Sequence, residues 1–414
     1  MTGALGGAHP RPDAAAKVSG QTRYVGDLAL PGMLHGALAV SPEASARVLG
    51  IDTAAARATP EVVAVLTAAD VPGVNQVGVI FPDQPLLVTD RVRMVGDRLA
   101  LVAARTAEAA WAAARSVEPR LDPLPAVHDP MAALAPGAPA LQEGGNLVRE
   151  FRVVRGDLEE ERGRAAVVVE ASYEVGGQDH AYLETQGCLA IPEGRRRITV
   201  VASCQCPFYI QHAVARVLGL PLASVRVEQA PTGGAFGGKE DYPSEPAACA
   251  ALLAWHTGRP VRLVFPRELD LQVTTKRHAV VVRHRWGADG DGRLVFAEVD
   301  AVLDAGAYVG LSTVVAERAN VSAIGPYQVP AVRVSTKVAL TNNLFGGAFR
   351  GFGAPQVTWA AEATMDRIAR ELGLDPVELR RRNVLDDEHP VTCTGQALRR
   401  PVITWSTTPR SGFR

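Results

Sequence analysis

Two glycine-rich turns, each set between an apolar run that predicts a strand and a run that predicts a helix, constrain the fold most. The first, residues 233–240, reads GGAFGGKE and follows a strand expected at 225–228. Four glycines in eight residues indicate backbone freedom, because glycine readily adopts positive φ and lets the backbone approach a ligand closely. A helix is expected next at 244–257, with Pro246 in its first turn and Gly258 past its end.

The second turn, residues 346–353, reads GGAFRGFG and lies between a strand expected at 334–340 and a helix expected at 358–372. Tight packing of strand against helix would explain one such turn. Two of them, each with a Phe flanked by glycine, favour one anionic ligand held by two loops, because a strand–turn–helix leaves backbone N–H groups free for an anion.

The spacing of Gly233, Gly238 and Lys239 also matches the start of the nucleotide-binding pattern G-x-x-x-x-G-K-[ST]. The next position holds Glu240, where a Mg²⁺-binding hydroxyl is needed, and its charge would repel a triphosphate. No clear strand ending in a metal-binding Asp lies at the usual distance. An ATPase is therefore disfavoured.

The composition predicts a globular protein of about two or three domains, since the 414 residues are 47% apolar. The 43 basic and 44 acidic residues leave a net charge of −1, which predicts neither a nucleic-acid nor a membrane partner. No leader or apolar run approaches a membrane span of about 18 residues. We expect a cytoplasmic location.

The cysteines are an odd number, five, and are widely scattered, so reduced thiols are expected rather than a disulfide framework. Only Cys204 and Cys206 lie close together. A lone C-x-C pair is weak evidence for zinc or iron–sulfur, which need about four ligands. We expect these two as small apolar residues in a strand.

Further elements give an alternating α+β pattern. Strands are expected at 34–40, 62–66, 99–103, 166–175 and 197–203, helices at 106–117 and 209–219, and a hairpin turn at 287–292. A Pro-rich and Gly-rich stretch indicates a domain boundary after residue 125. The expected domains are a flexible N-terminus (1–15), a first domain (16–125), a linker (126–148), a second domain (149–398) and a divergent or truncated tail (399–414).

Several motifs resemble those of the molybdopterin-binding subunit of the xanthine dehydrogenase and aldehyde oxidase family, in order and spacing as well as in wording. They are residues 233–240, 348–356 (AFRGFGAPQ), 177–184 (GQDHAYLE) and 317–319 (ERA). Residues 17–20 (KVSG), Asp27 and residues 34–37 (LHGA) are similar to the a/b hammerhead domain of that family. The resemblance implies an α+β chain: a hammerhead domain, then the first part of a molybdenum cofactor-binding domain.

For the cofactor, the resemblance implies that Gln205 donates from its amide to an oxygen on molybdenum. It implies that the Phe236-Gly237 turn passes the metal centre and that Arg350 lies near the cofactor. Molybdenum is held by the pterin dithiolene, so no protein ligand to the metal is expected. His180 and Glu184, four residues apart, are expected to be structural.

For the substrate, the resemblance implies that Glu240 and Arg318 are polar clamps and that Phe352 stacks on the ring. Glu and Arg recognise complementary edges of a heterocycle, and an aromatic face adds about 1 kcal/mol. Aldehyde-oxidising relatives typically carry apolar residues at the first two positions, so a purine is favoured. The alternatives stay open: a helix N-terminal carboxylate for Glu240, an ion pair at a strand end for Arg318, and a core ring for Phe352.

The resemblance also implies what lies outside this sequence. The family's general-base Glu belongs to a Gly-Glu-Pro-Pro motif, which is absent here, so it is expected in a missing C-terminal half. We expect an N-terminal half, truncated or cut by a frameshift, that alone retains no molybdenum.

The implied cofactor is molybdenum–molybdopterin, alone or as a dinucleotide. Separate 2Fe-2S and FAD subunits are implied, because the chain has neither the Cys pattern nor a Rossmann G-x-G-x-x-G. The implied function is hydroxylation of a purine of the hypoxanthine or xanthine type. The alternatives are an aldehyde or other N-heterocycle oxidoreductase, or a non-catalytic remnant or binding module.

Overall fold

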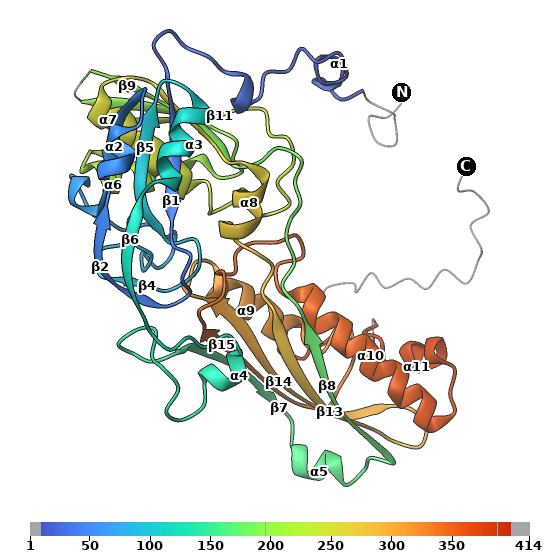
Figure 1. Ribbon diagram of the computed structural model, residues 1–414. Coiled ribbons are helices and arrows are strands. Elements are labelled where there is room, and N and C mark those ends of the chain that lie inside the picture. The colour runs from blue at the N-terminus through green and yellow to red at the C-terminus, as the bar shows by residue number, and fades with distance from the viewer. Residues whose placement is uncertain (1–9, 195, 387, 399–414) are drawn as a thin grey trace. The chain divides into compact units, whose positions relative to one another are not determined.

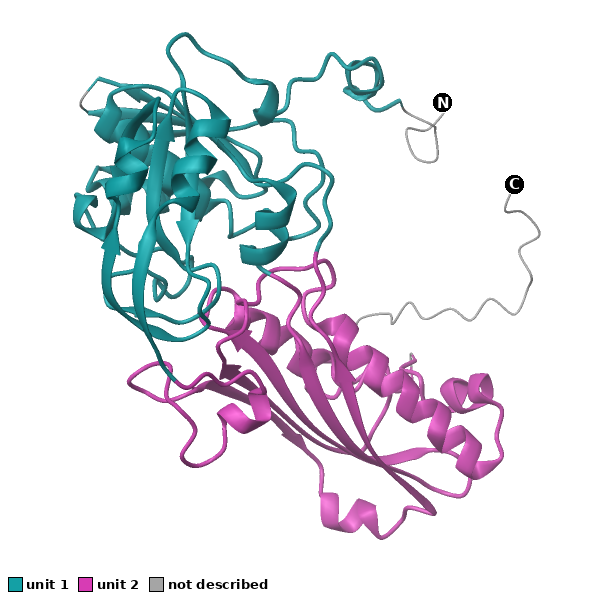
Figure 2. Cartoon of the chain, viewed as in Figure 1, with its two compact units in different colours: residues 1–124, 180–275 teal, residues 125–179, 276–414 magenta. Residues whose placement is uncertain are grey.

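The computed structural model describes residues 10–194, 196–386 and 388–398 (Figure 1). The chain forms two compact units, each built from two segments (Figure 2). Unit 1 contains residues 1–124 and 180–275, and unit 2 contains residues 125–179 and 276–414. Both units combine helices with a sheet, so the expected α+β class is confirmed.

Unit 1 is built on a seven-stranded sheet to which both of its segments contribute. The first segment supplies β1 (Leu34–Val40), β5 (Arg98–Ala104) and β3 (Val62–Leu66). The second supplies β9 (Gly187–Glu193), β10 (Arg197–Ala202), β11 (Val225–Gln229) and β12 (Val261–Val264). The parallel pair β1 and β12 joins the two. Residues 180–275 thus share a sheet with the first segment, whereas the boundaries expected from sequence follow chain order.

The helices of unit 1 pack against this sheet. The glycine-rich turn leads into α7 (Ser244–Thr257), which is buried from its first residue to Ala254 and contacts β9. Beside it lies α6 (Pro207–Leu218), which ends at Gly219 with φ 65°. Helix α3 (Ala107–Arg115) packs on β1 and β5, and its N-cap residue Thr106 accepts from the Ala109 N–H at 3.2 Å.

The remaining elements of unit 1 are short. They are α1 (Ala14–Val18), α2 (Ala54–Ala58), α8 (Arg267–Val273), the 3₁₀ turns η1 (Val25–Asp27), η2 (Ala68–Asp70) and η3 (Leu222–Ser224), and a small sheet of β4 (Arg91–Val92), β2 (Ala46–Asp52) and β6 (Glu118–Pro123). The expected tail, residues 399–414, lies outside the described residues, as do residues 1–9 of the expected N-terminal segment.

Unit 2 is built on a five-stranded sheet in the order β7 (Leu147–Arg155), β15 (Ala331–Leu340), β14 (Leu294–Gly306), β13 (Val280–Ala288), β8 (Val167–Val175). The hairpin turn expected at 287–292 joins the antiparallel pair β13 and β14. Helix α9 (Ser312–Ser322) packs on β15 and β7, and α10 (Ala354–Leu372) packs on β8 and β13 and against α9. The two helices therefore cover one face of the sheet (Figure 1).

The segment expected to be a linker is a folded part of unit 2. It contains α4 (Pro130–Ala133), which contacts β14 and β15, and it places Val127, Ala133 and Leu141 in the core. Proline and glycine punctuate this stretch, but its apolar residues find a buried surface. The other short helices of unit 2 are α5 (Leu158–Arg162) and α11 (Pro376–Asn383).

Two further predictions are testable on the described residues. All five cysteines are free thiols, as expected. The expectation that Cys204 and Cys206 lie in a strand is wrong: both follow the end of β10, and Cys206 is the N-cap residue of α6. None of the described helices is both long enough and apolar enough to span a membrane.

Candidate functional site

The first glycine turn uses its glycines in two different ways. Gly234 and Gly237 have φ values of +99° and +103°, which side chains rarely adopt. Gly233 and Gly238 are needed for space: a Cβ on Gly238 would lie 2.7 Å from the His180 and Tyr182 rings. Close packing and backbone freedom therefore both contribute to this turn. Phe236 has a positive φ of 56° and a side chain that is 50% exposed.

A buried ion pair anchors the turn. Lys239 is fully buried, and its Nζ donates to Glu184 Oε2 at 3.0 Å and to Ser203 Oγ at 2.9 Å. The same carboxylate oxygen accepts from the Gly233 N–H at 2.7 Å. Burial lowers the pKa of Lys239, and Glu184 opposes this shift. The lysine is therefore buried and already paired within the fold, which removes the nucleotide-loop interpretation.

Gln205 is held against this turn by two hydrogen bonds. Its N–H donates to the Lys239 carbonyl at 2.7 Å, and its side-chain Oε1 accepts from the Gly237 N–H at 3.0 Å. Since the amide oxygen is fixed as the acceptor, the NH₂ group is the end that can donate elsewhere. Gln205 is an exposed residue, so this donor is accessible within unit 1.

Glu240 follows the anchored lysine directly. Its N–H donates to the Gly237 carbonyl at 3.0 Å, and its side chain is half-buried. Burial raises the pKa of this carboxyl group. The next residue, Asp241, is buried, and desolvation raises its pKa to about 7. Nothing in the sequence pattern singled out Asp241, whose only signal is its position beside Glu240.

The second glycine turn also contains a strained aromatic residue. Phe352 has φ 52° between Gly351 (φ 98°) and Gly353 (φ 90°), and its ring is partly buried against the core of unit 2. A Cβ on Gly353 would lie 2.3 Å from the Val315 carbonyl oxygen of α9. The turn therefore packs directly against α9, where Arg318 lies on the exposed face. Arg318 is in a helix, so the strand-end alternative for it is wrong.

Arg350 is exposed in the same turn, and its carbonyl oxygen accepts from Arg277 Nη2 at 3.1 Å. The predicted residues thus fall into two groups. Gln205, Phe236, Gly237 and Glu240 belong to unit 1, whereas Arg318, Arg350 and Phe352 belong to unit 2.

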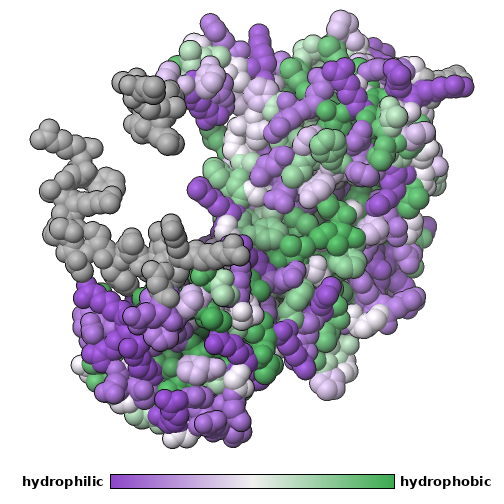
Figure 3. All heavy atoms as spheres, turned by 180° about the vertical axis from the view of Figure 1, so that it is seen from behind, coloured by the Kyte–Doolittle hydropathy of each residue, from purple (hydrophilic) through white to green (hydrophobic). Residues whose placement is uncertain are grey.

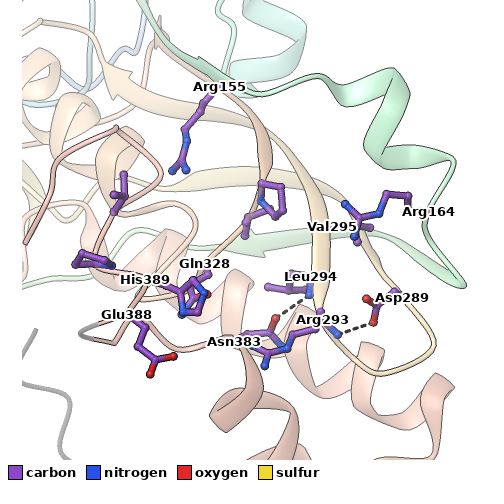
Figure 4. A pocket seen from close by; sticks show the side chains of 14 residues that line it. Arg155, Arg164, Asp289, Arg293, Leu294, Val295, Gln328, Asn383, Glu388 and His389 are labelled. Atoms are coloured by element: carbon purple, nitrogen blue, oxygen red, sulfur yellow. Dashed lines mark hydrogen bonds between the residues drawn. The ribbon is translucent and has the colours of Figure 1, made fainter.

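A cavity of about 570 Å³ in unit 2 contains none of the predicted residues (Figure 4). Three arginines, Arg155, Arg164 and Arg293, line it together with Asn383, which accepts from the Leu294 N–H at 2.7 Å. Arg155 donates to the Thr392 carbonyl at 2.8 Å, and Arg164 pairs with Glu161 at 2.9 Å. Because these arginines already have partners, this cavity is a weaker candidate for the functional site than the predicted residues are.

Comparison with known proteins agrees with both parts of the fold. Residues 19–125 match the family model of the "Aldehyde oxidase and xanthine dehydrogenase, a/b hammerhead domain", and residues 141–384 match that of the "Molybdopterin cofactor-binding domain". The chain belongs to the molybdopterin-binding subunits of the xanthine dehydrogenase and aldehyde oxidase family.

Three relatives give the scale of the similarity. A probable xanthine dehydrogenase subunit of Bacillus subtilis is 39% identical over 90% of this chain and 50% of its own length. The nicotinate dehydrogenase large molybdopterin subunit of Eubacterium barkeri is 37% identical over 96% of this chain and 93% of its own length. The solved aldehyde oxidoreductase of Desulfovibrio gigas has a TM-score of 0.87 and 33% identity, covering 94% of this chain and 44% of that one.

The chain therefore spans about half the length of two of these relatives, and nearly all of the third.

Proposed function

We propose that this chain contributes the substrate-contacting part of a molybdenum hydroxylase that oxidises a purine of the hypoxanthine or xanthine type with oxygen derived from water. The observation that carries the proposal is the placement of Glu240. The buried Lys239 fixes the backbone next to Glu240. The carboxyl group of Glu240 is half-buried, and burial raises its pKa. A carboxyl group held in this way suits the polar edge of a heterocycle.

The residues of the glycine turn fit a molybdenum–pterin group. Gln205 has its amide oxygen bound to the Gly237 N–H and its NH₂ end accessible, as a donor to an oxygen on the metal requires. No group of three or more His, Cys, Asp or Glu within the described residues suits direct binding of a metal ion. When bound, the cofactor supplies the two-electron oxidation and the site of oxygen insertion.

The side chains of this chain bind and orient the substrate. Glu240 accepts hydrogen bonds from donor groups of the ring, and Arg318 donates to its acceptor groups. Phe352 stacks on the face of the ring. The positive charge of Arg318 also stabilises negative charge that develops on the ring during oxidation. Phe236 and Arg350 complete the surroundings of the cofactor.

The proton acceptor is assigned to a Glu in a Gly-Glu-Pro-Pro motif, which this sequence lacks. Electron transfer is assigned to 2Fe-2S and FAD subunits. The relative named as a large molybdopterin subunit favours a working member of a multi-subunit enzyme over a remnant. The five free thiols fit a cytoplasmic location.

A second candidate substrate is another N-heteroaromatic ring, such as nicotinate. The observation that favours it is the 37% identity to the nicotinate dehydrogenase subunit over nearly its whole length. Purines and nicotinate both present ring nitrogens to polar side chains. The choice between these two substrates therefore depends on the polar clamps Glu240 and Arg318.

The test uses the chain assembled with the subunits or segment that complete the cofactor site. Turnover of hypoxanthine, xanthine, nicotinate and an aldehyde is compared in wild type, Glu240→Val and Arg318→Met, with molybdenum content measured in each. We expect purine turnover to be lost while metal content is unchanged. Unchanged purine kinetics in both variants would refute the clamp, and turnover of nicotinate alone would select the second candidate.

The 414-residue chain purified alone should retain no molybdenum. Stoichiometric metal in that preparation, together with turnover of hypoxanthine, would contradict this expectation.

A further inference from the structure

Unit 2 contains a second cavity, of about 420 Å³, directly after the second glycine turn. It lies where the end of β8 meets the start of α10, and its lining includes Glu174, Gln178, Arg277, Pro355, Gln356 and Trp359. None of the residues predicted to contact cofactor or substrate lines it. The surface of the described residues carries apolar side chains among polar ones (Figure 3). Trp359, which lines the cavity, is 51% exposed.

Arg277 is a buried cation whose partners are neutral. Its side chain donates from Nε to Gln178 Oε1 at 2.7 Å and from Nη2 to the Arg350 carbonyl at 3.1 Å, and it stacks 3.8 Å from the Phe349 ring centroid. The residue is only 8% exposed, and Nη1 has no hydrogen-bond partner among the described atoms. Burial lowers the pKa of Arg277, and no acidic group opposes this. A buried guanidinium that no anion contacts is unfavourable, so Nη1 of Arg277 is left as a donor for an anionic group.

Gln356 supplies an unsatisfied acceptor in the same cavity. It is 3% exposed, and its Nε2 donates to the His278 carbonyl at 3.2 Å. That contact fixes Oε1 as the acceptor, and Oε1 is buried with no partner among the described atoms. Trp359 adds an aromatic surface, held edge-on against Tyr173 at a ring distance of 5.5 Å.

We propose that this cavity binds a small planar carboxylate that also carries an N–H or O–H donor. The carboxylate pairs with Arg277 Nη1, the donor binds Gln356 Oε1, and the ring lies against Trp359. The volume falls in the usual range for small-molecule sites, about 300–1,000 Å³. Water would satisfy Gln356 but leave the guanidinium charge uncompensated, and the exposed Glu174 at the lining disfavours polyanions.

Calorimetric titration of the full chain with three probes tests each part of this site. The probes are 4-aminobenzoate, benzoate without the donor, and aniline without the carboxylate. We expect 4-aminobenzoate to bind best and aniline to bind at least about tenfold more weakly, because aniline cannot form the charge-assisted hydrogen bond. Arg277→Gln should remove the difference between 4-aminobenzoate and aniline. Gln356→Leu should remove the preference for 4-aminobenzoate over benzoate.

Arg367→Gln is the matched control, since Arg367 lies on α10 and stacks on Tyr173 at 5.3 Å without lining the cavity. It should bind all three probes as wild type does. If Arg277→Gln does not fold, Gln356→Leu and Trp359→Phe test the proposal instead. Trp359→Phe should bind both 4-aminobenzoate and benzoate more weakly than wild type does. No binding of any probe at about 1 mM, or wild-type binding in all folded cavity variants, would overturn the proposal.

Discussion

The guanidinium of Arg98 and the carboxylate of Glu245 form an ion pair inside unit 1, with side chains only 4% and 6% exposed. Arg98 begins β5 in the first segment, and Glu245 is the second residue of α7 in the other. The pair therefore joins the two segments directly behind the first glycine turn. Burial raises the pKa of Glu245 to about 7, and Arg98 opposes the rise.

Arg98→Met should destabilise the chain by about 3–5 kcal/mol, because it leaves a buried carboxyl group without its partner. Arg98→Met combined with Glu245→Met should cost less than the sum of the two single variants. Urea denaturation measures each free energy of unfolding. Arg226→Met is the control, since Arg226 and Glu228 form an exposed pair worth at most about 1 kcal/mol. Additive effects at Arg98 and Glu245 would contradict the coupling.

Gly238→Ala should destabilise the chain by about 1–3 kcal/mol, because its Cβ would lie 2.7 Å from two aromatic rings. Gly290→Ala is the matched control: its Cβ meets nothing within 4 Å, and its effect should stay within about 0.5 kcal/mol. The difference between the two unfolding midpoints in urea is the measurement. Equal midpoints would mean that this glycine is not required for space.

His278 should make stability depend on pH. Burial lowers its pKa from 6.5 to about 4, with Arg277 as a smaller cause. The unfolded chain therefore binds a proton that the folded chain does not, and stability falls as pH drops from 6.5 toward 4. The full loss from this group is about 3 kcal/mol.

His278→Gln should flatten that part of the stability profile, measured by urea denaturation at several pH values. His212→Gln is the control, because His212 is exposed on α6. A profile that stays as steep in His278→Gln as in wild type would show that other groups cause the dependence.

Local sequence signals predicted many elements of both units. Strands 34–40 and 62–66 and helix 244–257 have the bounds expected from apolar runs and their Pro and Gly punctuation. Segment pairing was not predictable in this way. The parallel contact of β1 with β12 joins residues more than 200 positions apart, and neither strand carries a local mark of its neighbour. The burial of Val127 and Leu141, in the segment expected as a linker, was not predictable either, since it depends on a distant core.

The candidate site was predictable only through its motifs. Glycine spacing indicated a special turn, but it could not separate Gly238, which makes space for two rings, from Gly237, which needs positive φ. The pairing of Lys239 with Glu184 was also hidden, since 55 residues separate them. The orphan atoms of Arg277 and Gln356 have no sequence signature, because being without a partner is a property of the surroundings.

Glu184→Gln separates a structural role for this carboxylate from a metal-binding one. Its Oε2 pairs with Nζ of Lys239, which is fully buried. Removing the negative charge leaves a buried ammonium without its counter-ion, and we expect a loss of about 3–5 kcal/mol in urea denaturation. Zn²⁺ should not stabilise the wild type, since this carboxylate oxygen already binds the ammonium group of Lys239. Glu170→Gln, at an acid whose side chain is 69% exposed, should change stability by less than about 1 kcal/mol. Stabilisation by Zn²⁺ in wild type that disappears in Glu184→Gln would instead assign this carboxylate to a metal site.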